Sequence, residues 1–275
     1  MPLPDVASSA DALDALRART PLVQSLTNIV SANFLTNVLL AAGATNAVID
    51  NPHEADGFAR IADAVLINLG TPNDGQAEAF TLAARAAGEA GTPWVLDPVG
   101  VGGLPWRTDL AAGLLEHRPT AIRGNASEIT ATAGLGGDGR GVDSGGADAA
   151  DSVKAAVALL EVSEAVSASG PTDYITGRTA DGDVATVRVH GGSALLPKVT
   201  ATGCSLGALS AAYLAVAPDA LTGLVAAHIH FAVAAEVAEK VSHGPGTFVP
   251  AFLDALAAVD PDAIRAQGRV TPGAA

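Results

Sequence analysis

The chain has 275 residues, 49% of them apolar, and a formal net charge of -14. This length and apolar content suit one large α/β domain over residues 1–275 better than a string of small modules. The strong negative charge argues against nonspecific binding to nucleic acid or anionic lipid, so any phosphate ligand must be held by local groups.

The amino terminus and the cysteine content indicate in which cellular compartment the protein is expected. Residues 1–19 contain acidic side chains and lack the basic start and apolar block of a secretion signal, so we predict a cytoplasmic protein. The most apolar region, Leu206 to Val241, is interrupted by proline, histidine and acidic residues that are costly in a bilayer, so no membrane span is predicted. The single cysteine, Cys204, cannot form an internal disulfide.

Strand-like and helix-like segments alternate through the first two thirds of the chain. Helical periodicity occurs at Ser31 to Ala42, Asp74 to Ala90 and Ala147 to Glu161. Since several of the strands are continuous apolar runs, we predict a mostly parallel sheet covered by helices on both faces, a three-layer α/β/α fold. The predicted strands are Val23 to Leu26, Ala47 to Asp50, Ala64 to Asn68, Trp94 to Asp97, Ala121 to Arg123 and Ala165 to Ala168.

Small polar residues and glycines mark the ends of these segments. Ser31 is placed to cap the helix that follows it, and Gly43 and Gly91 stand where two helices should end. The stretch Gly134 to Gly146 is rich in glycine and aspartate and is predicted to be an exposed loop.

The last third of the chain has a different pattern. Thr172 to His190 alternates like a β-hairpin that turns at Asp181-Gly182. From Gly203 to Ala258 the sequence is almost wholly helical. Gly244-Pro245-Gly246 is predicted to form a tight turn, which would close over a nucleotide if one is bound.

The segment Thr200 to Cys204 leads directly into the predicted helix Ser205 to Val216. Glycine allows a tight turn with exposed N–H groups, and a helix start adds unpaired donors and partial positive charge. The segment is therefore a candidate anion site that holds a transferring phosphoryl group, with Thr202, Gly203 and Cys204 as catalytic residues. The alternative is an ordinary glycine turn before a packed helix with a buried cysteine.

Polar side chains follow two of the predicted strands. Asp97 ends one strand, and Arg123, Asn125 and Glu128 lie at or after the end of the next. Ligands of open α/β sheets bind at the carboxyl ends of the strands, so Asp97 and Glu128 are candidates to share a hydrated Mg²⁺ ion with ATP. Alternatively, Asp97 starts a turn and Glu128 caps a helix.

Weaker signals come from other strand ends. Thr27-Asn28 and Asn68 to Thr71 are placed to line a small-molecule pocket, and Ser169-Gly170 offers a hydroxyl and a close backbone approach to a nucleotide phosphate. His228 and His230 have no zinc-like spacing and are interpreted as structural.

Together these segments resemble hydroxyethylthiazole kinase, a family of the ribokinase-like superfamily. The resemblance runs from about Pro21 to Val259. It rests on Gln24 to Asn28, Asn68 to Thr71, Leu96 to Gly100, Arg123 to Glu128, Ser169-Gly170, Lys198 to Cys204 and Gly244 to Phe248. It implies a ribokinase-like fold and transfer of a phosphoryl group from ATP, with Mg²⁺, to the hydroxyl of 4-methyl-5-(2-hydroxyethyl)thiazole in thiamine biosynthesis or salvage. A homotrimer with active sites between subunits is implied in the same way.

The resemblance also assigns roles to single positions. Arg123 and Ser169 match ATP contacts, and we place Asn125 and Thr200 beside them. Asp97 and Glu128 match the magnesium pair. Cys204 stands where related sugar kinases have an aspartate base, although its ordinary pKa of about 8.5 makes a strong base doubtful. The positions that match the thiazole site are Asn28, Gly70 and Ala201.

One position departs from the family pattern and leaves the substrate open. Val48 stands where many relatives have a methionine that contacts the thiazole, and valine is shorter and stiffer. The alternatives are a hydroxymethylpyrimidine or pyridoxal kinase, an ATP-dependent dehydratase of hydrated NAD(P)H, which usually has aspartate at the position of Cys204, and a noncatalytic nucleotide-binding sensor.

Overall fold

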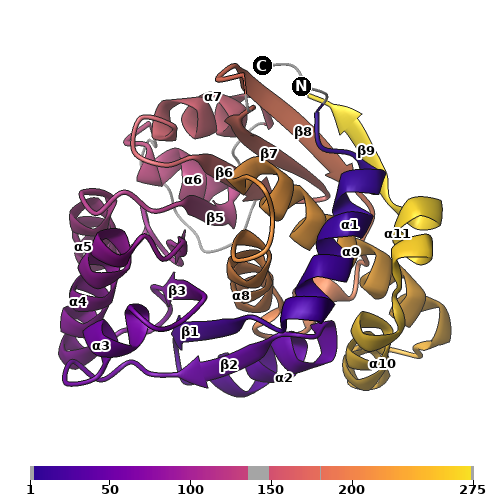
Figure 1. The fold of residues 1–275 in the computed structure, drawn as a ribbon, viewed down its shortest axis with the longest axis horizontal. Coiled ribbons are helices and arrows are strands. Elements are labelled where there is room, and N and C mark those ends of the chain that lie inside the picture. Colours follow the sequence, from indigo (N-terminus) through magenta and orange to yellow (C-terminus); the bar gives the residue numbers. More distant parts are fainter. Residues whose placement is uncertain (1–2, 136–148, 180, 274–275) are drawn as a thin grey trace.

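A computed structural model describes residues 3–135, 149–179 and 181–273, which form one nine-stranded sheet with helices packed on it (Figure 1). The strands are β1 (Leu22–Leu26), β2 (Thr45–Val48), β3 (Ala64–Asn68), β4 (Trp94–Asp97), β5 (Ala121–Asn125), β6 (Ala165–Ser169), β7 (Thr172–Arg178), β8 (Val184–His190) and β9 (Arg269–Pro272). The helices are α1 (Val6–Arg19), α2 (Ala32–Ala42), α3 (Ala55–Ala59), α4 (Asp74–Ala90), α5 (Pro105–Leu115), α6 (Ala126–Thr132), α7 (Ala149–Leu159), α8 (Thr202–Leu214), α9 (Ala220–Val241), α10 (Pro245–Ala258) and α11 (Pro261–Gln267), and a 3₁₀ turn, η1, spans Leu196–Lys198.

The strand order is β2-β1-β3-β4-β5-β6-β7-β8-β9, and the first six strands in this order pair in parallel. β7, β8 and β9 add antiparallel pairs at one side. The prediction of a mostly parallel sheet is therefore confirmed. Parallel pairing brings the carboxyl ends of β1, β3, β4, β5 and β6 to one edge of the sheet.

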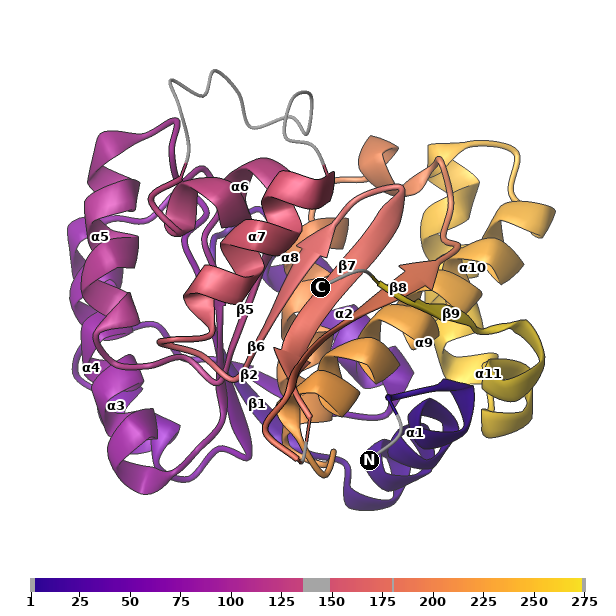
Figure 2. The same cartoon turned by 90° about the horizontal axis from the view of Figure 1, so that it is seen from above.

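Successive residues of the central strands face opposite sides of the sheet. Leu66 and Val95 pack into one apolar core, whereas Ile67 and Leu96 pack into the other. The first core lies under α1, α2 and α8 to α11, and the second lies under α3 to α7 (Figure 2). This double coverage gives the predicted three-layer arrangement and explains why the strands are continuously apolar.

The predicted helix ends hold at the glycines but not at Ser31. Gly43 and Gly91 follow α2 and α4 with φ of 104° and 72°, a left-handed conformation that glycine adopts without steric cost. Ser31 precedes α2, but its side chain makes no capping bond. Its Oγ instead bonds the hydroxyl of Thr27 at 2.8 Å and the carbonyl of Asn28 at 3.2 Å, so it stabilises the loop after β1.

Several other boundaries shift. β2 lies two residues before its predicted position because Leu22 to Ser25 of β1 pairs with Thr45 to Val48. α8 begins at Thr202, three residues earlier than predicted. The predicted tight turn at Gly244 to Gly246 is wrong, since these residues cap and open α10.

The antiparallel hairpin of β7 and β8 is confirmed. The N–H of Gly182 donates to the carbonyl of Thr179 at 2.8 Å, and Gly182 has a φ of 87°. The loop predicted at Gly134 to Gly146 lies outside the described residues except for Gly134 and Leu135.

Within the described ranges, α9 is the one helix long and apolar enough to cross a membrane. However, 89% of its most apolar window is buried inside the protein. Its two histidines are also bonded to protein groups, His228 to Asp173 and Ser167 and His230 to Tyr213 and Leu256. α9 is therefore a core helix of the fold. The interpretation of both histidines as structural is consistent with these bonds.

Candidate active site

A buried polar chain crosses the carboxyl edge of the parallel strands. Its members come from the ends of successive strands and from the start of α8, so residues separated by up to 176 positions meet in one place. Register places Asn68 beside Asp97, and Asn125 beside Ser169. In spatial order the chain contains Ser169, Arg123, Asp97, Asn68, Asn28 and Cys204.

The amides of Asn28 and Asn68 have their orientations fixed by backbone donors. Oδ1 of Asn28 accepts from the N–H of Ser31 at 3.0 Å, and Oδ1 of Asn68 accepts from the N–H of Gly70 at 3.0 Å. Each Nδ2 group must then face the other way. Nδ2 of Asn28 donates to Oδ1 of Asn68 at 2.9 Å and to Sγ of Cys204 at 3.7 Å.

Asp97 lies at the centre of the chain and is fully buried. Its Oδ2 accepts from Nδ2 of Asn68 at 2.7 Å, whereas its Oδ1 has no hydrogen-bond partner and lies 3.7 Å from Nη1 of Arg123. Burial raises the pKa of Asp97 to about 7, against the opposing effects of Arg123 and Asn68 and with a further upward contribution from Glu128. A buried carboxylate oxygen that lies near Arg123 but accepts no hydrogen bond has a lone pair left for a bound cation.

Arg123 is held between Asp97 and Ser169. Its Nε and Nη2 donate to Oγ of Ser169 at 3.2 and 3.1 Å, and the residue is 8% exposed. The edge of the guanidinium group formed by Nε and Nη2 is thereby fixed by the hydroxyl of Ser169, while Nη1 is directed towards the carboxylate of Asp97. This places a permanent positive charge at the same edge as the predicted anion site.

Glu128 connects the loops that follow β4 and β5. Its Oε1 accepts from the N–H of Gly100 at 3.1 Å and its Oε2 accepts from the N–H of Asn125 at 2.9 Å, while Oδ1 of Asn125 caps α6. The capping role that the sequence left open is therefore present. Glu128 also lies close enough to Asp97 to raise the pKa of that carboxyl.

Asp97 and Glu128 are two carboxylates near enough to interact electrostatically, and the described part of the chain holds no cluster of three or more histidine, cysteine or acidic side chains suited to a metal. This donor set fits Mg²⁺ better than a metal that needs a complete protein cage. Magnesium takes one or two carboxylates and completes its shell with phosphate oxygens and water.

The start of α8 presents free backbone donors to this edge. The first bond of the helix runs from the N–H of Ser205 to the carbonyl of Ala201 at 2.9 Å, so the N–H groups of Thr202, Gly203 and Cys204 have no acceptor within the helix. Ala201 precedes the helix with a φ of 69° and supplies no side-chain cap. The hydroxyl of Thr202 donates to the carbonyls of Leu196 and Val199, which leaves its backbone N–H as the group available to a ligand.

Two glycines let α8 approach the charged pair. A Cβ atom at Gly203 would lie 3.1 Å from Nη1 of Arg123, and one at Gly207 would lie 3.0 Å from Oδ2 of Asp97. The sequence predicted Gly203 from turn chemistry, but the residue lies inside the helix. Its physical role is close packing against the guanidinium group.

Cys204 lies at the Asn28 end of the polar chain, with its Sγ 3.7 Å from Nδ2 of Asn28. Burial, and then the charge of Asp97, raises the pKa of its thiol, while the amides of Asn28 and Asn68 and the charge of Arg123 oppose the shift. A raised pKa favours the protonated thiol at neutral pH. This agrees with the expectation from sequence that Cys204 is not a strong base.

Of the remaining predicted residues, Gly70 packs directly against this chain. A Cβ atom at Gly70 would lie 2.3 Å from Nδ2 of Asn28, so only glycine fits there without displacing the amide. Val48 ends β2 and is 39% exposed, and Thr200 is exposed before α8. Sequence reasoning placed Asn68 only in a pocket-lining segment and missed its bond to Asp97. The signal was its position at the end of the strand beside that of Asp97.

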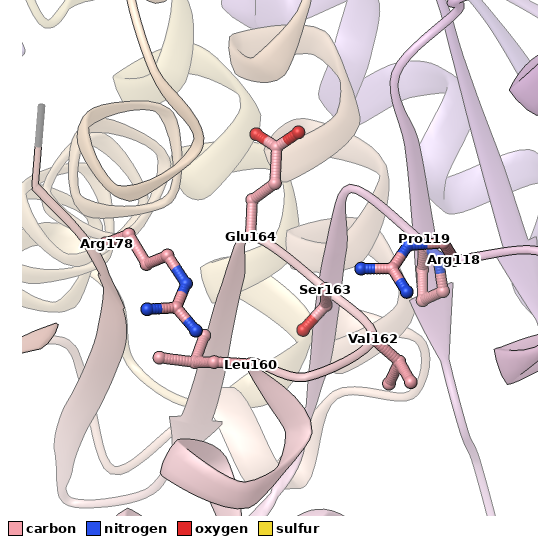
Figure 3. A pocket seen from close by; sticks show the side chains of 7 residues that line it. All are labelled: Arg118, Pro119, Leu160, Val162, Ser163, Glu164 and Arg178. Carbon is pink, nitrogen blue, oxygen red and sulfur yellow. The ribbon is translucent and has the colours of Figure 1, made fainter. Parts of the chain in front are cut away.

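A separate cavity of about 200 Å³ lies at the amino ends of β5 and β6, the opposite edge of the sheet (Figure 3). The guanidinium groups of Arg118 and Arg178 lie on either side of Ser163, with Glu164 beside them (Figure 3). None of the predicted site residues lines it. The cavity is therefore distinct from the candidate active site.

The fold is a mostly parallel sheet between two helical layers, and a buried aspartate and an arginine face a helix start at the carboxyl edge of that sheet. Together the fold and the site define a small-molecule kinase of the ribokinase-like class. Solved structures with this fold include Staphylococcus aureus pyridoxal kinase bound to AMP-PCP and pyridoxal, with a TM-score of 0.55 at 15% identity, over 79% of this chain and 88% of that one. Within this class the chain belongs to the hydroxyethylthiazole kinase family, whose family model matches residues 13–262.

Relatives support this assignment over nearly the full length. Hydroxyethylthiazole kinase of Rhodococcus erythropolis is 68% identical over 96% of this chain and 94% of its own, and that of Kineococcus radiotolerans is 51% identical over the same shares. The structure of the hydroxyethylthiazole kinase protein from Pyrococcus horikoshii has a TM-score of 0.86 at 33% identity, over 97% of this chain and 99% of that one. The family resemblance, the fold class and the kinase assignment from sequence are confirmed.

Proposed function

We propose that this chain transfers a phosphoryl group from ATP to the hydroxyl of 4-methyl-5-(2-hydroxyethyl)thiazole, giving the thiazole phosphate used to make thiamine phosphate. The observation that carries this proposal is the position of the free N–H groups of α8 beside the Asp97–Arg123 pair. A transferring phosphoryl group needs such fixed positive groups in a site that excludes water. The family relation supplies the identity of the alcohol.

ATP binds, in this proposal, on the side of Arg123, with Ser169, Asn125 and Thr200 beside it. The contacts of Arg123 with Ser169 and Asp97 support this role, since they hold the guanidinium group in place before ATP arrives. A preorganised cation stabilises phosphate charge without first having to reorient.

The thiazole alcohol binds on the opposite side, beside Asn28, Gly70, Ala201 and Val48. The fixed orientation of the Asn28 amide and the absence of a side chain at Gly70 support this role, because they place a polar surface of defined shape next to Cys204. The shorter Val48 leaves room where many relatives have methionine.

Asp97 and Glu128 would hold Mg²⁺ together with the phosphate oxygens of ATP. The unpartnered Oδ1 of Asp97 supports this assignment. When bound, the ion neutralises charge on the phosphates. The N–H groups of Thr202, Gly203 and Cys204 stabilise the transferring group. The substrate oxygen bonds to phosphorus as the bond from phosphorus to the ADP oxygen breaks, and the hydroxyl proton leaves to solvent. Because the transition state is loose, the protonated Cys204 thiol need not act as a strong base.

The assembly that we propose is a cytoplasmic homotrimer with active sites between subunits. Exposed apolar side chains beside the site support it: Ile29 and Val30, directly after Asn28, are 89% and 57% exposed. Two large apolar side chains exposed next to the proposed site are suited to cover by another subunit. Analytical ultracentrifugation should give three times the mass of 27.1 kDa, and a monomer that is fully active would contradict this assembly.

The substrate is tested with a panel of alcohols. Purified protein is mixed with MgATP and hydroxyethylthiazole, hydroxymethylpyrimidine or pyridoxal, and each phosphorylated product is followed by mass. The proposal predicts thiazole phosphate and ADP in equal amounts and the highest kcat/KM for the thiazole. Preference for either other alcohol would reassign the substrate within the fold. Dehydration of hydrated NAD(P)H, or ATP binding without ADP formation, would reject the kinase activity itself.

A further inference from the structure

A buried serine and histidine lie together with a partly buried aspartate next to the proposed nucleotide side. Nδ1 of His228 on α9 lies 2.7 Å from Oδ2 of Asp173 on β7, and Nε2 of His228 lies 3.1 Å from Oγ of Ser167 on β6. The His228 side chain is fully buried, and that of Asp173 is 18% exposed. These three residues therefore tie α9 to two strands of the sheet.

The arrangement does not serve nucleophilic catalysis. Ser167 is fully buried in the middle of β6, between the two helical layers, so a substrate cannot reach its Oγ. A nucleophile must be accessible to the reacting atom as well as bonded to its base. The bonds of His228 instead fix the position of Asp173.

Asp173 connects this cluster to the proposed site through its second oxygen. Its Oδ1 accepts from the backbone N–H of Gly170 at 2.9 Å. Gly170 directly follows Ser169, whose Oγ accepts two donors from Arg123. One carboxylate thus holds the core helix with one oxygen and the turn that orients the arginine with the other.

Holding this turn matters because an arginine side chain is flexible. An Arg side chain has several rotatable bonds, and part of its rotamer entropy is lost before it can bind a phosphate in a fixed geometry. Ser169 ends β6 and pairs with Asn125 of β5, whereas Gly170 lies just beyond the strand and is exposed, so the turn is the part of this segment that needs a further support. The bond from the N–H of Gly170 to Asp173 supplies that support, and the buried His228 side chain fixes the same carboxylate.

We propose that Asp173 and His228 are positioning residues for the nucleotide: they hold the Ser169-Gly170 turn and, through Oγ of Ser169, fix the guanidinium group of Arg123. The inference rests on the proposed role of Arg123 and Ser169 as ATP contacts. It assigns no contact with the thiazole, because Asn28 and Gly70 are held by other bonds, to Ser31 and Asn68.

Two variants of Asp173 separate a positioning role from a general effect on folding. Asp173→Ala removes the acceptor for Gly170 and the partner of His228. Asp173→Asn can retain both contacts, since its amide oxygen can accept from Gly170 while its NH₂ group can donate to Nδ1 of the His228 tautomer that carries its hydrogen on Nε2. The conservative variant should therefore restore what the alanine variant loses.

His230 provides a matched control on the same helix. It is also fully buried, but it bonds the hydroxyl of Tyr213 and the carbonyl of Leu256, which lie in the helical layer away from Ser169. His230→Gln disturbs a buried histidine without touching the turn. It should lower thermal stability and leave the affinity for ATP unchanged.

The experiment measures the Kd and KM for MgATP, the KM for the thiazole, thermal unfolding, and hydrogen exchange of the Gly170 amide in each variant. For Asp173→Ala we expect faster exchange at Gly170 and a roughly tenfold weaker affinity for MgATP, as for loss of a bond to a charged group, with the KM for the thiazole unchanged. Asp173→Asn should return both values towards those of the parent.

Three results would overturn the positioning role: unchanged MgATP affinity in Asp173→Ala, equal losses for both substrates, or an equal loss of ATP affinity in His230→Gln. A parent protein that binds MgATP but phosphorylates no thiazole would instead reject the proposed substrate alone. The ATP affinities of the variants would still decide the positioning role.

Discussion

Nδ2 of Asn68 donates a 2.7 Å hydrogen bond to Oδ2 of Asp97, while Oδ1 of the same buried carboxylate has no hydrogen-bond partner. The amide is itself oriented by the N–H of Gly70. The two oxygens of Asp97 are therefore distinguished by the protein: one is fixed by an amide, and the other is left for a ligand beside Arg123.

Replacing the free oxygen tests this distinction. Asp97→Asn keeps the size of the side chain but removes its charge, so we expect kcat to fall by about 10²–10³-fold, as for loss of one electrostatic stabiliser, together with loss of magnesium activation. Steady-state rates against Mg²⁺ concentration measure both. Asp262→Asn, at a side chain that is 92% exposed, is the control. A parent-like magnesium curve for Asp97→Asn would remove Asp97 from the metal site.

The Cys204 thiol should contribute little as a base. Since burial raises its pKa, Cys204→Ala should retain measurable turnover, with a loss no larger than the roughly 10²–10⁴-fold of a general base. Single-turnover rates at saturating substrates report the chemical step. A folded variant that binds ATP and shows no turnover would contradict this role.

Two added methyl groups should separate the two sides of the site. Gly70→Ala places a Cβ 2.3 Å from Nδ2 of Asn28, so we expect a higher KM for the thiazole. Gly203→Ala places a Cβ 3.1 Å from Nη1 of Arg123, so we expect a higher KM for ATP. Gly113→Ala is a control, because a Cβ there meets nothing within 4 Å. If both site variants changed the same KM, the division into two sides would be wrong.

The strands that carry the site were predictable because each ends an apolar run with a polar residue. The bounds of β3 and β4 match their predictions, and parallel topology then brings Asn68 and Asp97 to one edge. By contrast, β9 is short and largely exposed, and its strand conformation comes from pairing with β8, a contact that no local pattern reports.

The connections within the site were not predictable in the same way. The bond from Asn28 to Asn68 depends on side-chain rotamers on two strands, and the cap formed by Glu128 depends on where α6 begins. Gly207 looks like any small residue within a helical run, and only the packed structure shows that a side chain there would meet Asp97. The sequence pattern predicts which residues lie at the carboxyl edge of the sheet, whereas side-chain packing in the folded protein decides which of their atoms are in contact.

His230 should make the free energy of unfolding fall as the pH is lowered. Burial lowers its pKa to about 4, so below about pH 6.5 the unfolded chain takes up a proton that the folded chain resists. The free energy of unfolding should fall between pH 6.5 and 4, with about 3 kcal/mol from this residue. Urea unfolding at several pH values measures it. His230→Gln should show a shallower pH dependence, and parallel curves for variant and parent would contradict the assignment.

The backbone before α8 offers a stability prediction. Ala201 has a φ of 69°, a left-handed conformation that costs a non-glycine residue about 1–2 kcal/mol. Ala201→Gly relieves this cost, partly offset by the larger backbone entropy of glycine in the unfolded chain, so we expect a gain of about 0.5–1 kcal/mol. Denaturant midpoints measure it. A loss of stability would show that the methyl group of Ala201 makes packing contacts that outweigh the strain.

The central claim is that the N–H groups at the start of α8 receive the phosphoryl group beside Asp97 and Arg123. A crystal structure with Mg²⁺, a non-hydrolysable ATP analogue and hydroxyethylthiazole tests it most directly. The account predicts the terminal phosphate within hydrogen-bond distance of the N–H groups of Gly203 and Cys204, with the thiazole hydroxyl on the side of Asn28. A terminal phosphate bound elsewhere, with these amides closed off from both ligands, would contradict it.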